Sequence, residues 1–256
     1  METYYQKVNS EWKKMTLRGI TGKNVKIAVL DTGNNNNPDF SVNFTADPQP
    51  DVFGHGSLTG SIIKSSLGLA KNCILYNVKV ITDSGIITPD SIIQGLSYAL
   101  ANNVDVISMS FTVGYYNQLI QDKINECTAA GIILMASSGN NTSLDEIKYP
   151  AGGLNVIAVN SIDDNGLVYY KNALTGSLTH GIDICCNGLS SECLDKNGNV
   201  TDNNGTSLST PWLAGAFALV KESLNYPSNK IVMDYILKKA LKQPDTQLYG
   251  KGNFTF

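Results

Sequence analysis

The segment VKIAVLDTG, residues 25–33, is an apolar run that ends in an acid, a hydroxyl residue and a glycine. Similar apolar, β-branched runs follow at 73–81, 104–111, 131–139 and 155–162, and segments of helical period lie between them. This alternation of strands and helices predicts a parallel sheet with helices on both faces. We therefore expect an α/β fold, a three-layer sandwich in which a mostly parallel central sheet is flanked by helices.

Composition limits both the size of the protein and its partners. The chain has 256 residues, of which 42% are hydrophobic and 16% charged, so residues 1–256 are expected to form a single domain around one large core. The net charge is −3 and Arg18 is the only arginine, which leaves no basic stripe for nucleic acid. No stretch approaches the ~18 uninterrupted apolar residues of a membrane helix, and the N-terminus has no apolar signal segment. We expect a cytoplasmic protein with no membrane span and no nucleic-acid partner.

The five cysteines have neither a metal-ligand spacing nor the even count of a disulfide framework. Free thiols in a reducing compartment are therefore expected, and neither a metal centre nor a cofactor is indicated. A bridge from Cys185 or Cys186 to Cys193 is the alternative.

The acid at the end of the first run, Asp31, has three interpretations. Asp-Thr-Gly is a turn of aspartic proteases, and a second turn of this kind, Asp-Ser-Gly, begins at Asp83. A serine protease instead uses a buried aspartate to orient a histidine. An Asp that follows a strand and precedes a Gly is also ordinary turn chemistry. Aspartic proteases are all-β, whereas Asp31 ends a strand of an α/β sheet, where side chains line a ligand crevice, so the pattern disfavours the first interpretation.

Histidine is scarce in this sequence, which contains only His55 and His180. His55 lies between two glycines at the start of a predicted helix, where another side chain can approach closely. His180 lies in a polar turn and is expected on the surface. A reaction that needs an imidazole near neutral pH therefore points to His55.

Two further polar residues lie where catalysis could use them. Ser207 precedes the apolar helix WLAGAFALV, so it lies near a helix N-terminus, where unpaired N–H groups favour negative charge. The motif is not the Gly-x-Ser-x-Gly turn, because Ser209 occupies the place of the second glycine. Asn140 follows a predicted strand, and its carboxamide could stabilise an oxyanion by about 3 kcal/mol. Structural roles are the alternatives, with Ser207 as a helix N-cap and Asn140 as a turn residue.

The four motifs VLDTG, GHGS, SSGN and GTSLSTP, in this order, resemble those of the subtilisin-like serine proteases, the subtilases. The resemblance implies a catalytic triad in which Ser207 is the nucleophile, His55 the general base and Asp31 the acceptor that orients the imidazole. It also implies that Asn140 and the Ser207 backbone N–H form the oxyanion hole. A catalytically silent subtilase-like peptide-binding or regulatory protein is an alternative, and an aspartic protease is a more distant one.

The resemblance also implies a peptide or protein substrate in extended conformation, bound as an added strand between two segments of the protein. Larger residues replace the family's glycines in the first specificity pocket, and Lys148 lies near its base. We therefore expect small, polar or acidic residues before the scissile bond, unless Lys148 turns into solvent. The expected substrate-binding residues are Gly85, Ile86, Ile87, Ser110, Phe111, Thr112, Ser138, Gly139 and Lys148.

Three further expectations follow from the resemblance. The Tyr149–Pro150 peptide bond is expected to be cis. The calcium site that secreted subtilases form at an aspartate corresponding to Asp39 is expected to be empty, because the loop at 65–72 is too short to supply the roughly six to eight oxygen ligands. Because the sequence starts at Met1 shortly before the first strand, the chain is expected to resemble the intracellular subtilases that remove leader peptides.

Overall fold

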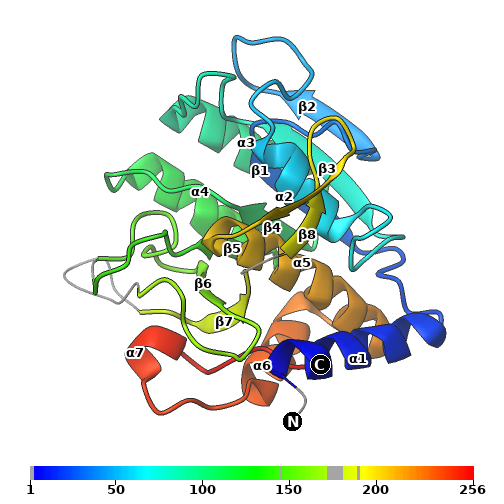
Figure 1. The fold of residues 1–256 in the computed structure, drawn as a ribbon. Helices are drawn as coiled ribbons and strands as arrows, with labels where there is room; N and C mark the ends of the chain where they lie inside the picture. The colour runs from blue at the N-terminus through cyan, green and yellow to red at the C-terminus, as the bar shows by residue number, and fades with distance from the viewer. Residues whose placement is uncertain (1–2, 145, 172–180, 189–190) are drawn as a thin grey trace.

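The centre of the protein is a sheet of seven parallel strands (Figure 1). The structure is a computed structural model, and it describes residues 3–144, 146–171, 181–188 and 191–256. The predicted α/β class, a three-layer sandwich with a parallel central sheet, is confirmed. In spatial order the strands are β2 (Phe40–Asn43), β3 (Ile74–Lys79), β1 (Lys26–Asp31), β4 (Val106–Met109), β5 (Ile133–Ser137), β6 (Ile157–Ile162) and β7 (Ile184–Asn187).

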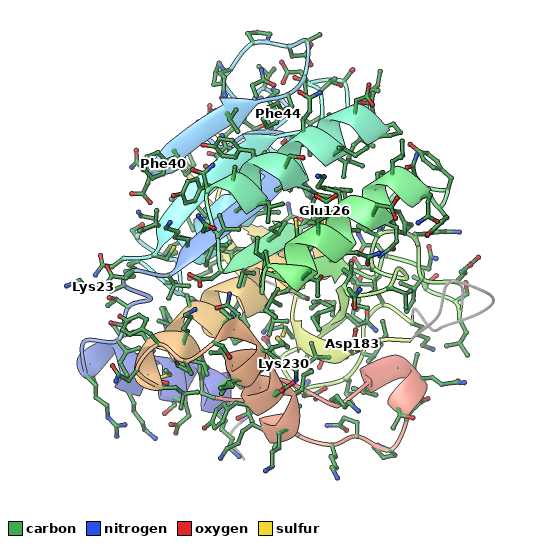
Figure 2. All side chains as sticks on the ribbon, turned by 180° about the vertical axis from the view of Figure 1, so that it is seen from behind. Lys23, Phe40, Phe44, Glu126, Asp183 and Lys230 are labelled. Carbon is green, nitrogen blue, oxygen red and sulfur yellow. The ribbon has the colours of Figure 1, made fainter. Side chains whose placement is uncertain are left out.

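Helices cover both faces of this sheet. Figure 1 shows the near face of the sheet, and Figure 2 shows the far face. Within the described parts of the chain, no helix combines the length and the apolar character needed to cross a bilayer. The near face carries α2 (His55–Ile63), α5 (Thr206–Ser223) and α6 (Asn229–Lys239), with α1 (Tyr4–Leu17) at the edge of the same core, and the far face carries α3 (Pro89–Ala101) and α4 (Gln118–Ala129).

Strand β1 shows why the strands of this sheet are continuous apolar segments in the sequence. Ile27 and Val29 pack into the core under α2 and α5, whereas Ala28 and Leu30 pack into the core under α3 and α4. A strand that is covered on both faces needs apolar side chains at every position, so its sequence does not alternate.

The sequence did not predict β2, β7 or the antiparallel hairpin of β8 (Ser191–Leu194) and β9 (Val200–Asn203). Each of these strands has only four residues, and short polar segments such as FSVN carry no clear apolar period. A short helix, α7 (Thr246–Tyr249), was also not predicted. The five cysteines are all free and buried, so the alternative of a disulfide bridge is wrong.

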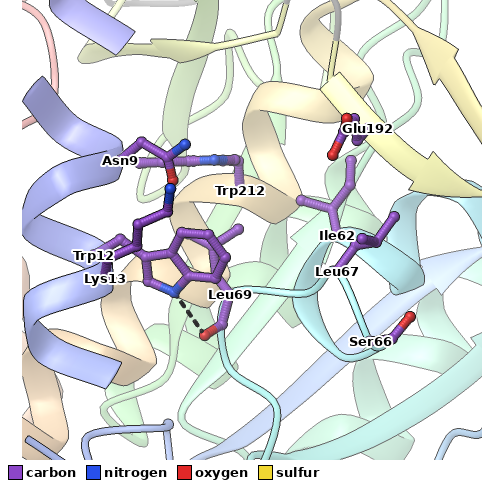
Figure 3. Close-up of a pocket in the computed structure, with 9 residues that line it drawn as sticks. All are labelled: Asn9, Trp12, Lys13, Ile62, Ser66, Leu67, Leu69, Glu192 and Trp212. Carbon is purple, nitrogen blue, oxygen red and sulfur yellow. Dashed lines mark hydrogen bonds between the residues drawn. The ribbon is translucent and has the colours of Figure 1, made fainter. Parts of the chain in front are cut away.

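The N-terminal helix closes one end of the near-face core (Figure 3). Trp12 donates a hydrogen bond of 3.2 Å from its Nε1 to the Leu69 carbonyl, which ties α1 to the loop after α2. A hollow of about 250 Å³ lies beside Trp12, with Trp212 of α5 on its wall. None of the residues predicted for the functional site lines this hollow.

The predicted site residues converge at one edge of the sheet because the strands are parallel. The β1–β4 register pairs Leu30 with Met109, and the β4–β5 register pairs Met109 with Ala136. The residues that follow these partners, including Asp31 and Ser110, therefore lie at the same carboxyl edge. This edge is where open α/β sheets bind their ligands.

Candidate active site

Asp31, the last residue of β1, is a fully buried carboxylate with donors on both oxygens. Oδ1 accepts the Thr32 N–H at 2.7 Å, and Oδ2 accepts the Thr59 hydroxyl of α2 at 3.2 Å. The His55 Nδ1 lies 2.8 Å from Oδ1 and 3.0 Å from Oδ2. These contacts fix the carboxylate in one orientation, with the imidazole of His55 against it.

His55 is the first residue of α2, and its side chain is 29% exposed. The negative charge of Asp31 raises the pKa of His55 above its ordinary value, and burial opposes that effect. The hydrogen bond that His55 donates to Asp31 and the charge of Asp51 also raise this pKa. With Nδ1–H donating to Asp31, the neutral imidazole carries its lone pair on Nε2, as a general base requires.

Glycines on both sides of His55 bring α2 close to the end of β1. Gly54 has a φ of +97°, a conformation that other residues rarely adopt. At Gly56 a Cβ would lie 1.9 Å from the Gly33 carbonyl oxygen, so no side chain fits there. The two glycines thus permit the approach that brings His55 to Asp31.

Ser207 is the second residue of α5 and is partly exposed. Its Oγ donates to the Ser110 carbonyl at 3.2 Å, and the Ser110 Oγ donates to the Ser207 carbonyl at 2.8 Å. Among the hydrogen bonds of the described residues, none joins Ser207 to His55. Catalytic hydrogen bonds are often long or misaligned before substrate binds, and a rotation of the Ser207 side chain would release Oγ from Ser110.

Asn140 lies beside the start of α5, and its amide is oriented by Thr206. The Asn140 Oδ1 accepts the Thr206 N–H at 2.9 Å and lies 2.8 Å from the Thr206 Oγ1. With Oδ1 engaged as an acceptor, the Nδ2 amino group is the part of the amide available for a ligand. The Ser207 N–H belongs to the first turn of α5 and has no intrahelical acceptor, so two donors are available at this helix end.

The segments predicted to bind substrate lie on both sides of this centre. One is a tight turn closed by a bridge between Ile81 and Ile87, in which Gly85 has a φ of +80° and Ile86 is 59% exposed. The other runs from Ser110 to Val113, whose N–H donates to the Tyr149 carbonyl at 2.7 Å.

The pocket residues predicted from the sequence differ in their exposure. Thr112 and Lys148 are exposed, and Lys148 lines a hollow of about 240 Å³ beside Val113. Phe111 and Ser138 are buried, and the Ser138 Oγ lies 3.3 Å from the Asn160 Oδ1 in the core. Ser138 is 0% exposed, so its side chain does not line the cleft, whereas Gly139 is partly exposed.

Two of the family-based expectations concern the surroundings of the site. The Tyr149–Pro150 bond is cis, as predicted, and Gln49–Pro50 is also cis, which the sequence did not predict. The Asp39 Oδ2 accepts a hydrogen bond of 2.5 Å from the Lys64 ammonium and one of 2.7 Å from the Leu75 N–H. The Lys64 ammonium therefore occupies the carboxylate that calcium would need as a ligand. The residues present do not fit a calcium site.

The described residues were also expected to hold no other metal and no cofactor. Within the described ranges, no group of three or more His, Cys, Asp or Glu side chains is placed to hold a metal ion. The expected absence of a metal stays a prediction. His180, which the sequence places on the surface, lies outside the described residues.

One residue of the site was missed. Asp51 lies four positions before His55, is 1% exposed, and bonds to residues next to both Asp31 and His55. Its spacing from His55 was the only signal in the sequence, because its partners come from two separate segments.

The chain is similar to known proteins in sequence and in fold. The Subtilase family model matches residues 22–253. Subtilisin Savinase of Lederbergia lenta is 34% identical over 247 residues, which cover 92% of this chain and 90% of that protein. Alkaline protease of Alkalihalobacillus alcalophilus is also 34% identical over 247 residues, but the chain spans only 64% of its length. Among solved structures, a mutant of the protease domain of PatA matches with a TM-score of 0.82 and 23% identity, over 92% of this chain and 94% of that one.

Proposed function

Because the chain belongs to the subtilase family of serine proteases, we propose that it is a serine endopeptidase in which Asp31, His55 and Ser207 act as a catalytic triad. The observation that carries this proposal is the His55 Nδ1 at 2.8 and 3.0 Å from the two oxygens of the buried Asp31. The pair fixes the tautomer in which Nε2 accepts a proton.

The acylation step assigns one role to each residue. Ser207 Oγ attacks the carbonyl carbon of the scissile peptide bond while His55 Nε2 takes its proton, and Asp31 stabilises the imidazolium that forms. The negative charge that develops on the carbonyl oxygen is stabilised by the Asn140 Nδ2, the Ser207 N–H and the N-terminus of α5. The leaving amine then takes the proton from His55 as the carbon–nitrogen bond breaks. An ester to Ser207 remains.

Deacylation repeats these roles with water. His55 removes a proton from a water molecule, which attacks the ester carbonyl. The same oxyanion donors act again, and the proton returns to Ser207 Oγ as the product acid leaves.

The substrate is a peptide segment in extended conformation. It adds as a strand between Gly85–Ile87 on one side and Ser110–Thr112 on the other, because both segments lie beside the triad. Residues 138–139 and Lys148 complete the pocket for the side chain before the scissile bond.

We also propose that the enzyme acts in the cytoplasm and removes leader peptides from modified precursors. Five free, buried cysteines are compatible with a reducing compartment. Mass spectrometry of cleavage products from an unbiased peptide library would identify the sequence that is cut. Cell fractionation would locate the protein, and its recovery outside the cytoplasm would contradict the proposal.

The proposed chemistry is tested by covalent labelling. A fluorophosphonate should label the protein once, and Ser207→Ala should abolish both labelling and peptide hydrolysis while the circular dichroism spectrum stays unchanged. A catalytically silent binding protein would remain unlabelled at every concentration, and an aspartic protease would instead be inhibited by pepstatin. Labelling of Ser207→Ala to the wild-type level would refute the assignment.

A further inference from the structure

A second buried carboxylate, that of Asp51, lies beside the triad without touching it. Its side chain is 1% exposed and accepts four hydrogen bonds. Oδ1 accepts the Thr32 hydroxyl at 2.9 Å and the Gly54 N–H at 2.7 Å. Oδ2 accepts the Ser57 N–H at 2.8 Å and the Ser57 hydroxyl at 2.7 Å. Both oxygens are thus fully used by groups of the protein.

The partners of Asp51 flank the two charged members of the triad. Thr32 follows Asp31 in the chain, and Gly54 precedes His55. The Thr32 hydroxyl also accepts the Gly56 N–H at 2.8 Å. One carboxylate therefore joins the end of β1 to the residues on both sides of His55.

Asp51 also caps the helix that carries His55. The N-cap residue of α2 is Gly54, which has no side chain to accept the free N–H groups of the first turn. Asp51 takes this role from outside the helix, because it accepts the N–H of Gly54 and of Ser57. Without it, the first turn of α2 would lose the acceptor that holds it against β1.

We propose that Asp51 is a positioning residue. It holds the start of α2 against the end of β1, so that the His55 Nδ1 stays within hydrogen-bonding distance of Asp31. The inference rests on the proposed triad, but it concerns a residue that touches neither the substrate nor the reacting atoms. A carboxylate at this position also adds negative charge near the imidazole, so its removal changes both the geometry and the titration of His55.

The charges around His55 come from several elements. Asp31 lies on β1, and Asp51 lies in the loop before α2. Lys79 of β3 is paired with Asp31 in the sheet register, is fully buried, and forms an ion pair with Asp83. Lys196, in the turn between β8 and β9, donates to the Val52 carbonyl at 2.5 Å. Asp51 and Asp31 are the charges that raise the pKa of His55, so loss of Asp51 alone should lower it.

The decisive variant is Asp51→Asn, which keeps the size of the side chain but removes the charge and turns an amino group toward the N–H donors. We expect kcat per fluorophosphonate-titrated site to fall at least about tenfold while KM changes little, because misplacement of a catalytic base slows the chemical step. The acidic limb of the kcat/KM profile should move to lower pH, because a nearby negative charge is lost.

Two further variants separate positioning from stability. Thr32→Val removes the hydroxyl between Asp51 and Gly56 but leaves the charge, so kcat should fall several-fold with no movement of the pH profile. The matched control is Asp105→Asn, because Asp105 precedes β4 at the opposite edge of the sheet and accepts the Lys26 N–H at 2.9 Å and the Lys221 ammonium at 2.6 Å. It should lower the melting temperature without altering kcat or the pH profile.

A readout that does not depend on activity is available because the chain has only two histidines. In a His180→Gln background the imidazole NMR signal of His55 can be titrated alone, and Asp51→Asn should lower its pKa. Wild-type kcat per titrated site together with an unmoved His55 titration would overturn the proposal. If Asp51→Asn does not fold, a wild-type kcat in Thr32→Val overturns it instead. A wild-type protein that fluorophosphonate does not label refutes the proposed function, and the NMR titration still tests Asp51.

Discussion

Substitution of Asn140 by Ala should reduce kcat while leaving KM nearly unchanged. The Nδ2 donor acts on charge that is absent from the bound substrate and appears only on the developing oxyanion. Loss of one such donor costs about 3 kcal/mol, or roughly 100-fold in rate. The assay is steady-state hydrolysis of a fluorogenic peptide, normalised to the sites that fluorophosphonate titrates.

Thr206→Val gives a graded version of the same perturbation. Valine removes the Oγ1 that lies 2.8 Å from the Asn140 Oδ1 but keeps the N–H bond of 2.9 Å, so the amide retains one of its two anchors. One hydrogen bond contributes about 1 kcal/mol, so the expected loss in kcat is about 5-fold.

The double variant Asn140→Ala with Thr206→Val decides whether Thr206 acts through the amide. If it does, the double variant should be no slower than Asn140→Ala alone, because there is no amide left to orient. Two results would refute the reasoning: multiplied losses in the double variant, or a loss in Asn140→Ala that appears only in KM. Equal melting temperatures for the four proteins would show that the effect is not one of stability.

Three other outcomes are expected. Because Asp31 raises the pKa of His55 and only the neutral imidazole accepts a proton, the acidic limb of wild-type kcat/KM should be centred above pH 6.5, and a centre at or below that value would contradict the assignment. A chelator should leave the melting temperature unchanged, whereas Lys64→Met should lower stability by about 1 kcal/mol because Asp39 loses its cation. A fall with chelator that calcium reverses would reveal a metal site. In a series of peptides that differ only before the scissile bond, small, polar or acidic residues should be preferred, and Lys148→Ala should weaken the acidic preference; an unchanged preference for Phe or Tyr would exclude this specificity.

The residues of the proposed triad could be found in the sequence because each of them lies in a short motif with its own local structure. Asp31 ends an apolar strand, His55 starts a glycine-flanked helix, and Ser207 starts an apolar one. The sheet could be predicted because its central strands are covered on both faces and therefore appear in the sequence as continuous apolar runs.

Features that depend on distant partners were not predictable. Asp51 is recognisable only when its hydrogen bonds to Thr32 and Ser57 are seen, because its spacing from His55 does not by itself reveal these partners. Ser138 was expected to line a pocket, but its side chain faces Asn160. The sequence does not reveal which way the side chain at the end of a strand points, because that direction depends on the twist of the strand. The bond from Ser207 to the Ser110 carbonyl likewise depends on how β4 meets α5.

Helix α5 is buried continuously at positions 208–220, immediately after Ser207. A segment of this kind belongs to the part of a protein whose amide protons exchange only through global unfolding. The proposed nucleophile therefore lies at the start of a helix whose amide protons should exchange slowly, whereas the turn at 82–87 that borders the proposed cleft has exposed residues. On warming, the cleft should loosen and substrate affinity should weaken first, while the capacity to react with fluorophosphonate should persist until the whole core unfolds.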